Sequence, residues 1–84
     1  MDIINKLAAI GFQKEANGGG TEIMIRRGVD GHTWVASGLD GDLPEGDNWL
    51  ICEYRAADWE EGLDDVRAFG STHDCLSDVI ALIP

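Results

Sequence analysis

The feature that most constrains the fold is a pair of short runs in which apolar and polar residues alternate. Residues 21–28 read TEIMIRRG and residues 32–37 read HTWVAS, a pattern typical of β-strands. Asp30 and Gly31 between the runs form a turn signal of the kind that joins antiparallel strands, so a hairpin is predicted. The preceding NGGGT, residues 17–21, is read as a flexible connector. In the first run, alternation separates Ile23 and Ile25 from Glu22, Met24 and Arg26.

Further strands are expected after this hairpin. Residues 48–55, NWLICEYR, are rich in aromatic and branched side chains, and residues 64–70, DDVRAFG, are a candidate for a short fourth strand. Alternation in the first of these runs puts Leu50, Cys52 and Tyr54 on one face and Trp49, Ile51 and Glu53 on the other. Both faces carry apolar residues. The sequence therefore leaves open whether Trp34 and Trp49 lie in the core or at an interface, including one with a second copy of the chain.

A short helix is expected near the N-terminal end, over residues 2–12. Asp2 can cap its first turn, and Gly11 stands where a left-handed residue ends many helices. Phe12 follows at the position that folds back onto Leu7 in this type of helix end. The signals at both ends therefore predict the same helix.

A second helix is expected over residues 71–84. Ser71 followed by Asp74 resembles a capping box, and an apolar stripe is formed by Leu76, Val79, Ile80 and Ile83. Two amphipathic helices need a sheet face to cover, which predicts a two-layer α+β domain. Its expected order is N-terminal helix, antiparallel sheet of three or four strands, C-terminal helix. With 84 residues, the chain is expected to form one domain, residues 1–84.

The negative charge of the chain is concentrated in one segment. The formal net charge is −10 at pH 7. Residues 1–39 carry four acids and four bases, residues 40–65 carry ten acids against Arg55 alone, and residues 66–84 add two acids and Arg67. This distribution disfavours direct binding to nucleic acid or to an anionic membrane surface, and it favours a basic partner.

Metal binding is one alternative for the acidic segment. A calcium loop that began at Asp40 would have Asp42 as its second ligand, but Pro44 stands where the next ligand belongs. A zinc site would require four residues to converge, namely Cys52, Cys75, His32 and His73. The sequence has no Cys-x-x-Cys pair, which is the usual signature of such a site. We therefore expect no metal, and a weak calcium site at residues 40–47 remains the minor alternative.

The sequence contains no catalytic signature. Its serines, cysteines and histidines form no nucleophile-and-base motif, and paired catalytic carboxylates need a cleft that so small a domain rarely builds. The chain opens MDIINKL, without the basic start of a secretory signal, and it holds no apolar run of membrane-spanning length. With its two cysteines read as reduced thiols, the expectation is a non-enzymatic cytoplasmic protein without a cofactor.

The acidic segment has two halves, DGDLPEGD at residues 40–47 and DWEEGLDD at residues 58–65, on either side of a predicted strand. That strand would separate them by roughly 20 Å, and an extended DGD backbone would place Asp40 and Asp42 on one side, about 7 Å apart. A partner-binding surface is predicted, with an aromatic anchor at Trp59. Its candidate residues are Asp40, Asp42, Glu45, Asp47, Asp58, Trp59, Glu60, Glu61, Asp64 and Asp65. The ordinary alternative is a pair of solvated loops.

On these features the chain resembles the small acidic proteins that bacteriophages use against host defence, such as anti-CRISPR proteins and other DNA-mimicking inhibitors. The resemblance lies in the short length, the strong acidity and the segments DGDLPEGD and DWEEGLDD, and it implies no particular fold. It implies an inhibitor whose carboxylates occupy lysine and arginine sites of a host nucleoprotein complex. Because both faces of the predicted strands carry apolar residues, a monomer or a homodimer is expected.

A plain protein–protein module, such as an immunity-type partner of a basic toxin, is the main rival interpretation. It would bind through a sheet edge or an apolar patch around Trp49 and Ile51, with the acids serving solubility or orientation. Ionic strength distinguishes the two, because a mimic complex should weaken steeply with salt and an apolar complex should weaken less.

Overall fold

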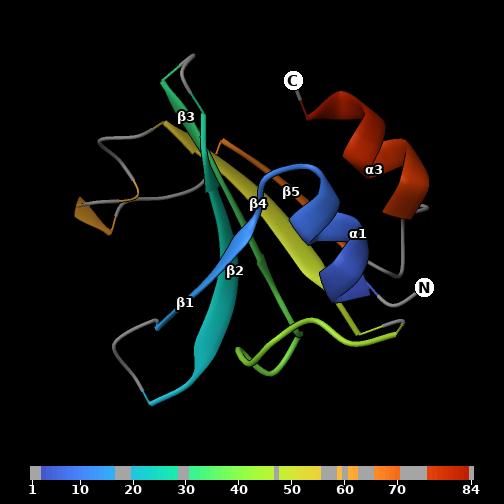
Figure 1. Ribbon diagram of the computed structural model, residues 1–84. Coiled ribbons are helices and arrows are strands. Elements are labelled where there is room, and N and C mark those ends of the chain that lie inside the picture. The colour runs from blue at the N-terminus through green and yellow to red at the C-terminus, as the bar shows by residue number, and fades with distance from the viewer. Residues whose placement is uncertain are drawn as a thin grey trace.

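The computed structural model describes residues 3–16, 20–28, 31–46, 48–55, 59, 61–62, 66–70 and 76–83. The elements follow the order α1 (Ile3–Ala9), β1 (Gln13–Ala16), β2 (Glu22–Arg27), β3 (His32–Ser37), β4 (Leu50–Arg55), β5 (Arg67–Gly70) and α3 (Leu76–Leu82). Each strand pairs antiparallel with the next, so the sheet order is β1-β2-β3-β4-β5. The described helices α1 and α3 lie on the same face of this sheet (Figure 1), which confirms the α+β prediction.

Within the described residues the sheet already has five strands, so the expected count of three or four is wrong. The additional strand is β1, which follows α1 directly and pairs with β2 through contacts such as Glu15 opposite Ile23. All four of its residues are exposed, and QKEA has no apolar alternation that could have identified it. The connector at residues 17–21 therefore joins two paired strands, and the candidate fourth strand is present as β5.

The end of α1 has the predicted geometry. Gly11 has a φ of 100°, and its N–H donates to the carbonyl of Ala8 over 3.1 Å. The N–H of Phe12 donates to the carbonyl of Leu7, also over 3.1 Å, and both side chains belong to one core cluster. These two hydrogen bonds define a Schellman motif. The helix is shorter than the predicted residues 2–12, and Asp2 lies outside the described residues.

The C-terminal helix also contributes the predicted apolar face. Val79 is buried, and the partly buried residues packed against the same core include Leu76, Ile80 and Ile83. The described helix begins at Leu76, later than the predicted residues 71–84, and the proposed capping box lies outside the described residues. Within the described ranges, no helix is long and apolar enough to cross a membrane.

The main core lies between the two helices and the sheet. Its buried members are Ile3, Leu7, Phe12, Met24, Trp34, Ala36, Trp49, Ile51 and Val79. Trp34 and Trp49 are only 1% and 3% exposed, which places both tryptophans in the core. Ile51 is fully buried as well. The apolar patch that the rival interpretation placed around Trp49 and Ile51 is therefore not at the surface.

A smaller apolar cluster lies on the opposite face of the sheet. Ile23, Ile25 and Val35 are buried there, with Tyr54 and Trp59 packed against them. The pairing of Ile25 with Val35, and of Val35 with Cys52, places these side chains on the face predicted from alternation. Each face of the sheet therefore has its own apolar cluster. The described residues of the two acidic halves lie before β4 (Asp40, Asp42 and Glu45) and after it (Glu61).

Candidate functional site

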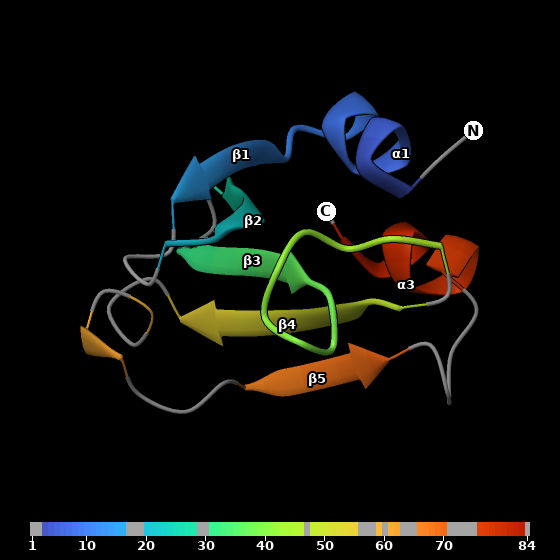
Figure 2. The ribbon, with the colours of Figure 1, turned by 90° about the horizontal axis from the view of Figure 1, so that it is seen from below.

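The loop that connects β3 to β4 carries the first acidic half and is here called the acidic loop, residues 38–48. Its backbone is folded on itself. The N–H of Gly38 donates to the carbonyl of Asp42 over 2.6 Å, and Glu45 and Asn48 exchange two backbone hydrogen bonds of 3.0 Å and 2.7 Å. The N–H of Leu39 donates to Oδ1 of Asn48 over 2.6 Å. These hydrogen bonds hold the described part of the acidic loop, residues 38–46 and 48, in a defined conformation, and Figure 2 shows it passing over the ends of β3 and β4.

The segment DGD is a turn, so the expectation of an extended backbone is wrong. Gly41 has a φ of 86°, which reverses the chain. Oδ1 of Asp40 accepts from the N–H of Asp42 over 3.5 Å, and Oδ1 of Asp42 accepts from the N–H of Leu43 over 2.8 Å. Short acidic side chains satisfy nearby amides in this way, and that local bonding competes with an extended strand.

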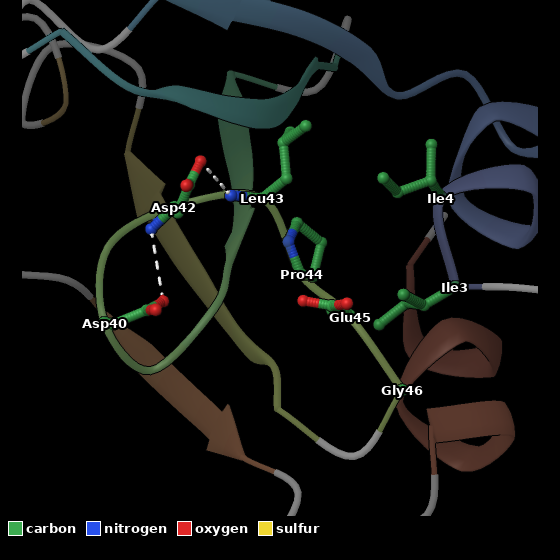
Figure 3. Close-up of a pocket in the computed structure, with 8 residues that line it drawn as sticks. All are labelled: Ile3, Ile4, Asp40, Asp42, Leu43, Pro44, Glu45 and Gly46. Atoms are coloured by element: carbon green, nitrogen blue, oxygen red, sulfur yellow. Dashed lines mark hydrogen bonds between the residues drawn. The ribbon is translucent and has the colours of Figure 1, made fainter.

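A cavity of about 450 Å³ lies between the acidic loop and α1. Its walls are formed by Ile3, Ile4, Asp40, Asp42, Leu43, Pro44, Glu45 and Gly46. In Figure 3, the side chains of Ile3 and Ile4 extend from α1 toward the acidic loop. Pro44 is fully buried, and Leu43 packs against the main core. The acidic loop is thus fixed to the domain by its apolar residues, while its described carboxylates stay exposed.

Three of the predicted site residues meet at this cavity. Asp40, Asp42 and Glu45 are all exposed and all line it. Within the described part of the chain, none of the three forms an ion pair. Two arginines are paired elsewhere, Arg27 with Glu15 over 2.8 Å and Arg67 with Glu53 over 2.7 Å. The carboxylates at the cavity are therefore available to an external cation.

The second acidic half lies at the other end of β4. Trp59 is half-buried and packs against Tyr54, with ring centroids 5.2 Å apart and planes inclined by 53°. Glu61 is exposed. Figure 1 shows the described part of this segment, drawn in orange, on the side of the sheet away from α1 and α3. The remaining predicted site residues, Asp47, Asp58, Glu60, Asp64 and Asp65, lie outside the described residues.

The two described residues that were considered for zinc, His32 and Cys52, lie on opposite faces of the sheet. His32 contacts Glu53 on the helix-covered face of the sheet, whereas Cys52 pairs with Val35 on the other face. His73 and Cys75 lie outside the described residues. Among the residues that the structure places, no group of three or more His, Cys, Asp or Glu side chains could hold a metal ion.

A buried carboxylate, that of Glu53, lies outside the residues predicted from the sequence to form a site. Glu53 is 3% exposed, and its two oxygens contact Nε of Arg67 at 2.7 Å and Nδ1 of His32 at 2.5 Å. The hydrogen bond from Arg67 holds the pKa of Glu53 below its ordinary value, against the opposing effect of burial, and His32 contributes in the same direction. The sequence did carry a signal for it, because strand alternation puts the charged Glu53 on the same face as the apolar Trp49 and Ile51.

Comparison with known proteins gives this chain no family. No family model, no curated protein and no solved structure matches it. The geometry and charge of the acidic loop and its cavity are therefore the features of this chain that bear on function.

Proposed function

We propose that this chain is a non-enzymatic acidic inhibitor that binds a basic, nucleic-acid-binding surface of a host defence nucleoprotein complex, in the manner of DNA-mimicking anti-CRISPR proteins. It would act in the cytoplasm of a bacterial host. The observation that carries the proposal is the acidic loop, which holds Asp40, Asp42 and Glu45 exposed around one cavity. Such carboxylates can occupy lysine and arginine sites that otherwise contact phosphate, and so exclude DNA competitively.

Two physical properties support this proposal. The acidic loop is closed by backbone hydrogen bonds between Gly38 and Asp42 and between Glu45 and Asn48. An ordered loop loses little conformational entropy when it binds, so more of the interaction energy appears as affinity. The net charge of −10 also favours rapid encounter with a positively charged surface.

The alternative proposal is a protein–protein module that binds through an apolar surface or a sheet edge. It is supported by β1 and β5, which are the edge strands, and by three large apolar side chains at the surface. These side chains are Leu39, Val66 and Leu82, which are 59%, 50% and 52% exposed. They are scattered over three segments, which is common for surface apolar residues, so this alternative is the weaker one.

The experiment that tests the proposal is affinity capture of bound proteins from a bacterial lysate, with washes at low and high salt and elution by DNA. A nucleic-acid-binding complex that is released by salt and displaced by DNA is the expected result. A partner that resists high salt and ignores DNA would contradict the proposal and favour the apolar module.

Matched variants localise the contact. Asp40→Asn combined with Glu45→Gln removes two charges at the cavity, and Glu22→Gln combined with Asp78→Asn removes two exposed charges elsewhere. We expect the first pair to weaken capture at low salt about tenfold and the second pair to have a much smaller effect. Equal losses of capture in the two pairs of variants would mean that net charge alone, and not the cavity, determines binding of the partner.

A further inference from the structure

The cavity beside the acidic loop has a mixed wall, which charge mimicry alone does not require. Four of its lining residues are apolar, Ile3 and Ile4 from α1 and Leu43 and Pro44 from the acidic loop. Three others are the carboxylates of Asp40, Asp42 and Glu45. A volume of about 450 Å³ is far larger than a bare ion needs, and it falls within the range of sites that accept organic groups.

This combination of walls selects among ligands. The three carboxylates would repel an anion. A neutral apolar ligand would take the carboxylates out of water without offering them a hydrogen bond or an opposite charge. A long side chain with an alkyl stem and a cationic end satisfies both parts, because the stem contacts the apolar wall while the charge meets the carboxylates. Guanidinium is more weakly hydrated than ammonium and donates along several directions, so arginine suits an apolar, multi-carboxylate site better than lysine.

We propose that this cavity receives one arginine side chain of the protein partner, with its alkyl stem against Ile4 and Leu43 and its guanidinium among the carboxylates of Asp40, Asp42 and Glu45. The inference builds on the proposed function, and it adds an anchoring contact that fixes where the partner sits. The occupant is identified by charge complementarity, because a cavity with three carboxylates attracts a cationic side chain of a basic partner. Exposed Leu39, which precedes Asp40 in the same loop, offers the partner an additional apolar contact.

The direct test is an NMR titration of the isotope-labelled protein with Nα-acetyl-arginine methylamide. Saturable shifts of the backbone amides of Ile4, Leu43 and Gly46 are expected, since these residues line the cavity. The matched probe is Nα-acetyl-citrulline methylamide, which has nearly the same shape but no charge and should cause no saturable shift. The lysine analogue should bind more weakly than the arginine probe. Equal binding of the citrulline probe would overturn the proposal.

Two variants test the two halves of the wall. Ile4→Trp fills the cavity and leaves every carboxylate in place, so it should abolish saturable binding of the arginine probe. Glu45→Gln keeps the shape and removes one charge, and should weaken binding about two- to fivefold, whereas Asp78→Asn on α3, outside the cavity, should leave it unchanged. If Ile4→Trp does not fold, Ile4→Lys places a tethered cation in the cavity and should compete with the probe. Unaltered probe binding in the folded variant, or equal effects of Glu45→Gln and Asp78→Asn, would overturn the assignment.

The outcomes separate this inference from the proposed function. If the arginine probe does not bind while salt-sensitive capture still depends on Asp40 and Glu45, the inhibitor proposal stands and the arginine cavity is wrong. If the probe binds but the captured partner is not a nucleic-acid-binding complex, the cavity stands and the proposed target class is wrong.

Discussion

The Nε–H of Arg67 donates a 2.7 Å hydrogen bond to Oε1 of Glu53 and so connects the edge strand β5 to a carboxylate buried beneath it. The guanidinium carbon lies 5.8 Å from the ring centroid of Trp34 and 5.6 Å from that of Phe69. His32 contacts the other carboxylate oxygen. A buried charge is tolerated when its oxygens are satisfied in this way, and removal of a partner leaves it uncompensated.

We expect the stability of the domain to fall in acid partly through Glu53. Its pKa is lowered in the folded state, chiefly by the hydrogen bond from Arg67, so the unfolded chain takes up the proton first as the pH falls. The stabilisation is complete above the ordinary glutamate pKa of about 4.3 and is lost as the pH falls through the lowered value. Glu53→Gln should reduce the free energy of unfolding at pH 7 by about 1–3 kcal/mol and flatten its acid dependence. Urea unfolding at several pH values from neutral to acidic measures the free energy of unfolding and its dependence on pH. If Glu53→Gln left that pH dependence unchanged, the result would contradict this role.

Arg67→Met is expected to move acid unfolding to higher pH. The substitution keeps most of the apolar stem but removes the largest influence that lowers the pKa of Glu53, while the burial that raises it persists. The matched control is Arg27→Met, because Arg27 pairs with Glu15 at the surface, where side-chain exposures are 49% and 44%. Solvent screens such a pair, so the control should change stability little. Tryptophan fluorescence during acid titration measures the midpoints, and equal midpoints in the two variants would refute the prediction.

Much of the fold could be predicted because its signals are local. The turn residues between β2 and β3 predict a hairpin, and Gly11 followed by Phe12 predicts the end of α1, both of which the structure confirms. The strand β1 could not be predicted, since its residues are exposed on both faces and it is a strand only through its hydrogen bonds to β2. An edge strand of this kind depends on a partner and not on its own pattern.

The candidate site could be predicted only in part. Acidic composition identified Asp40, Asp42 and Glu45, which the structure brings to one cavity. Composition could not reveal the apolar wall, because Ile4 reaches the acidic loop only through the tertiary packing of α1 (Figure 3). The contact between Glu53 and Arg67 likewise depends on the register of β4 with β5.

Gly38→Ala should disturb the acidic loop through steric contact. A Cβ at this position would lie 2.8 Å from Oδ1 of Asp40 and 3.1 Å from the carbonyl oxygen of Leu43, which is backbone and cannot rotate away. We expect a loss of about 1–3 kcal/mol in the free energy of unfolding, with shifted amide resonances at the cavity. The control is Gly41→Ala, where no atom lies within 4 Å and the penalty of about 1–2 kcal/mol arises from the positive φ alone. If Gly38→Ala left the resonance of Leu43 unchanged, the close packing of the acidic loop would be in doubt.

Trp59→Ala is expected to destabilise the domain, because Trp59 packs on Tyr54 and on the apolar cluster of the sheet face that the helices do not cover. A half-buried tryptophan contributes part of the stabilisation of a fully buried aromatic side chain, so a loss of about 1–3 kcal/mol is expected, with increased binding of a hydrophobic dye to the uncovered cluster. Trp59→Phe retains a ring against Tyr54 and should lose less. Thermal melting with and without the dye measures the difference. If Trp59→Ala melted like the parent protein but no longer captured its partner, Trp59 would instead be the binding anchor that its acidic neighbours in the sequence suggest.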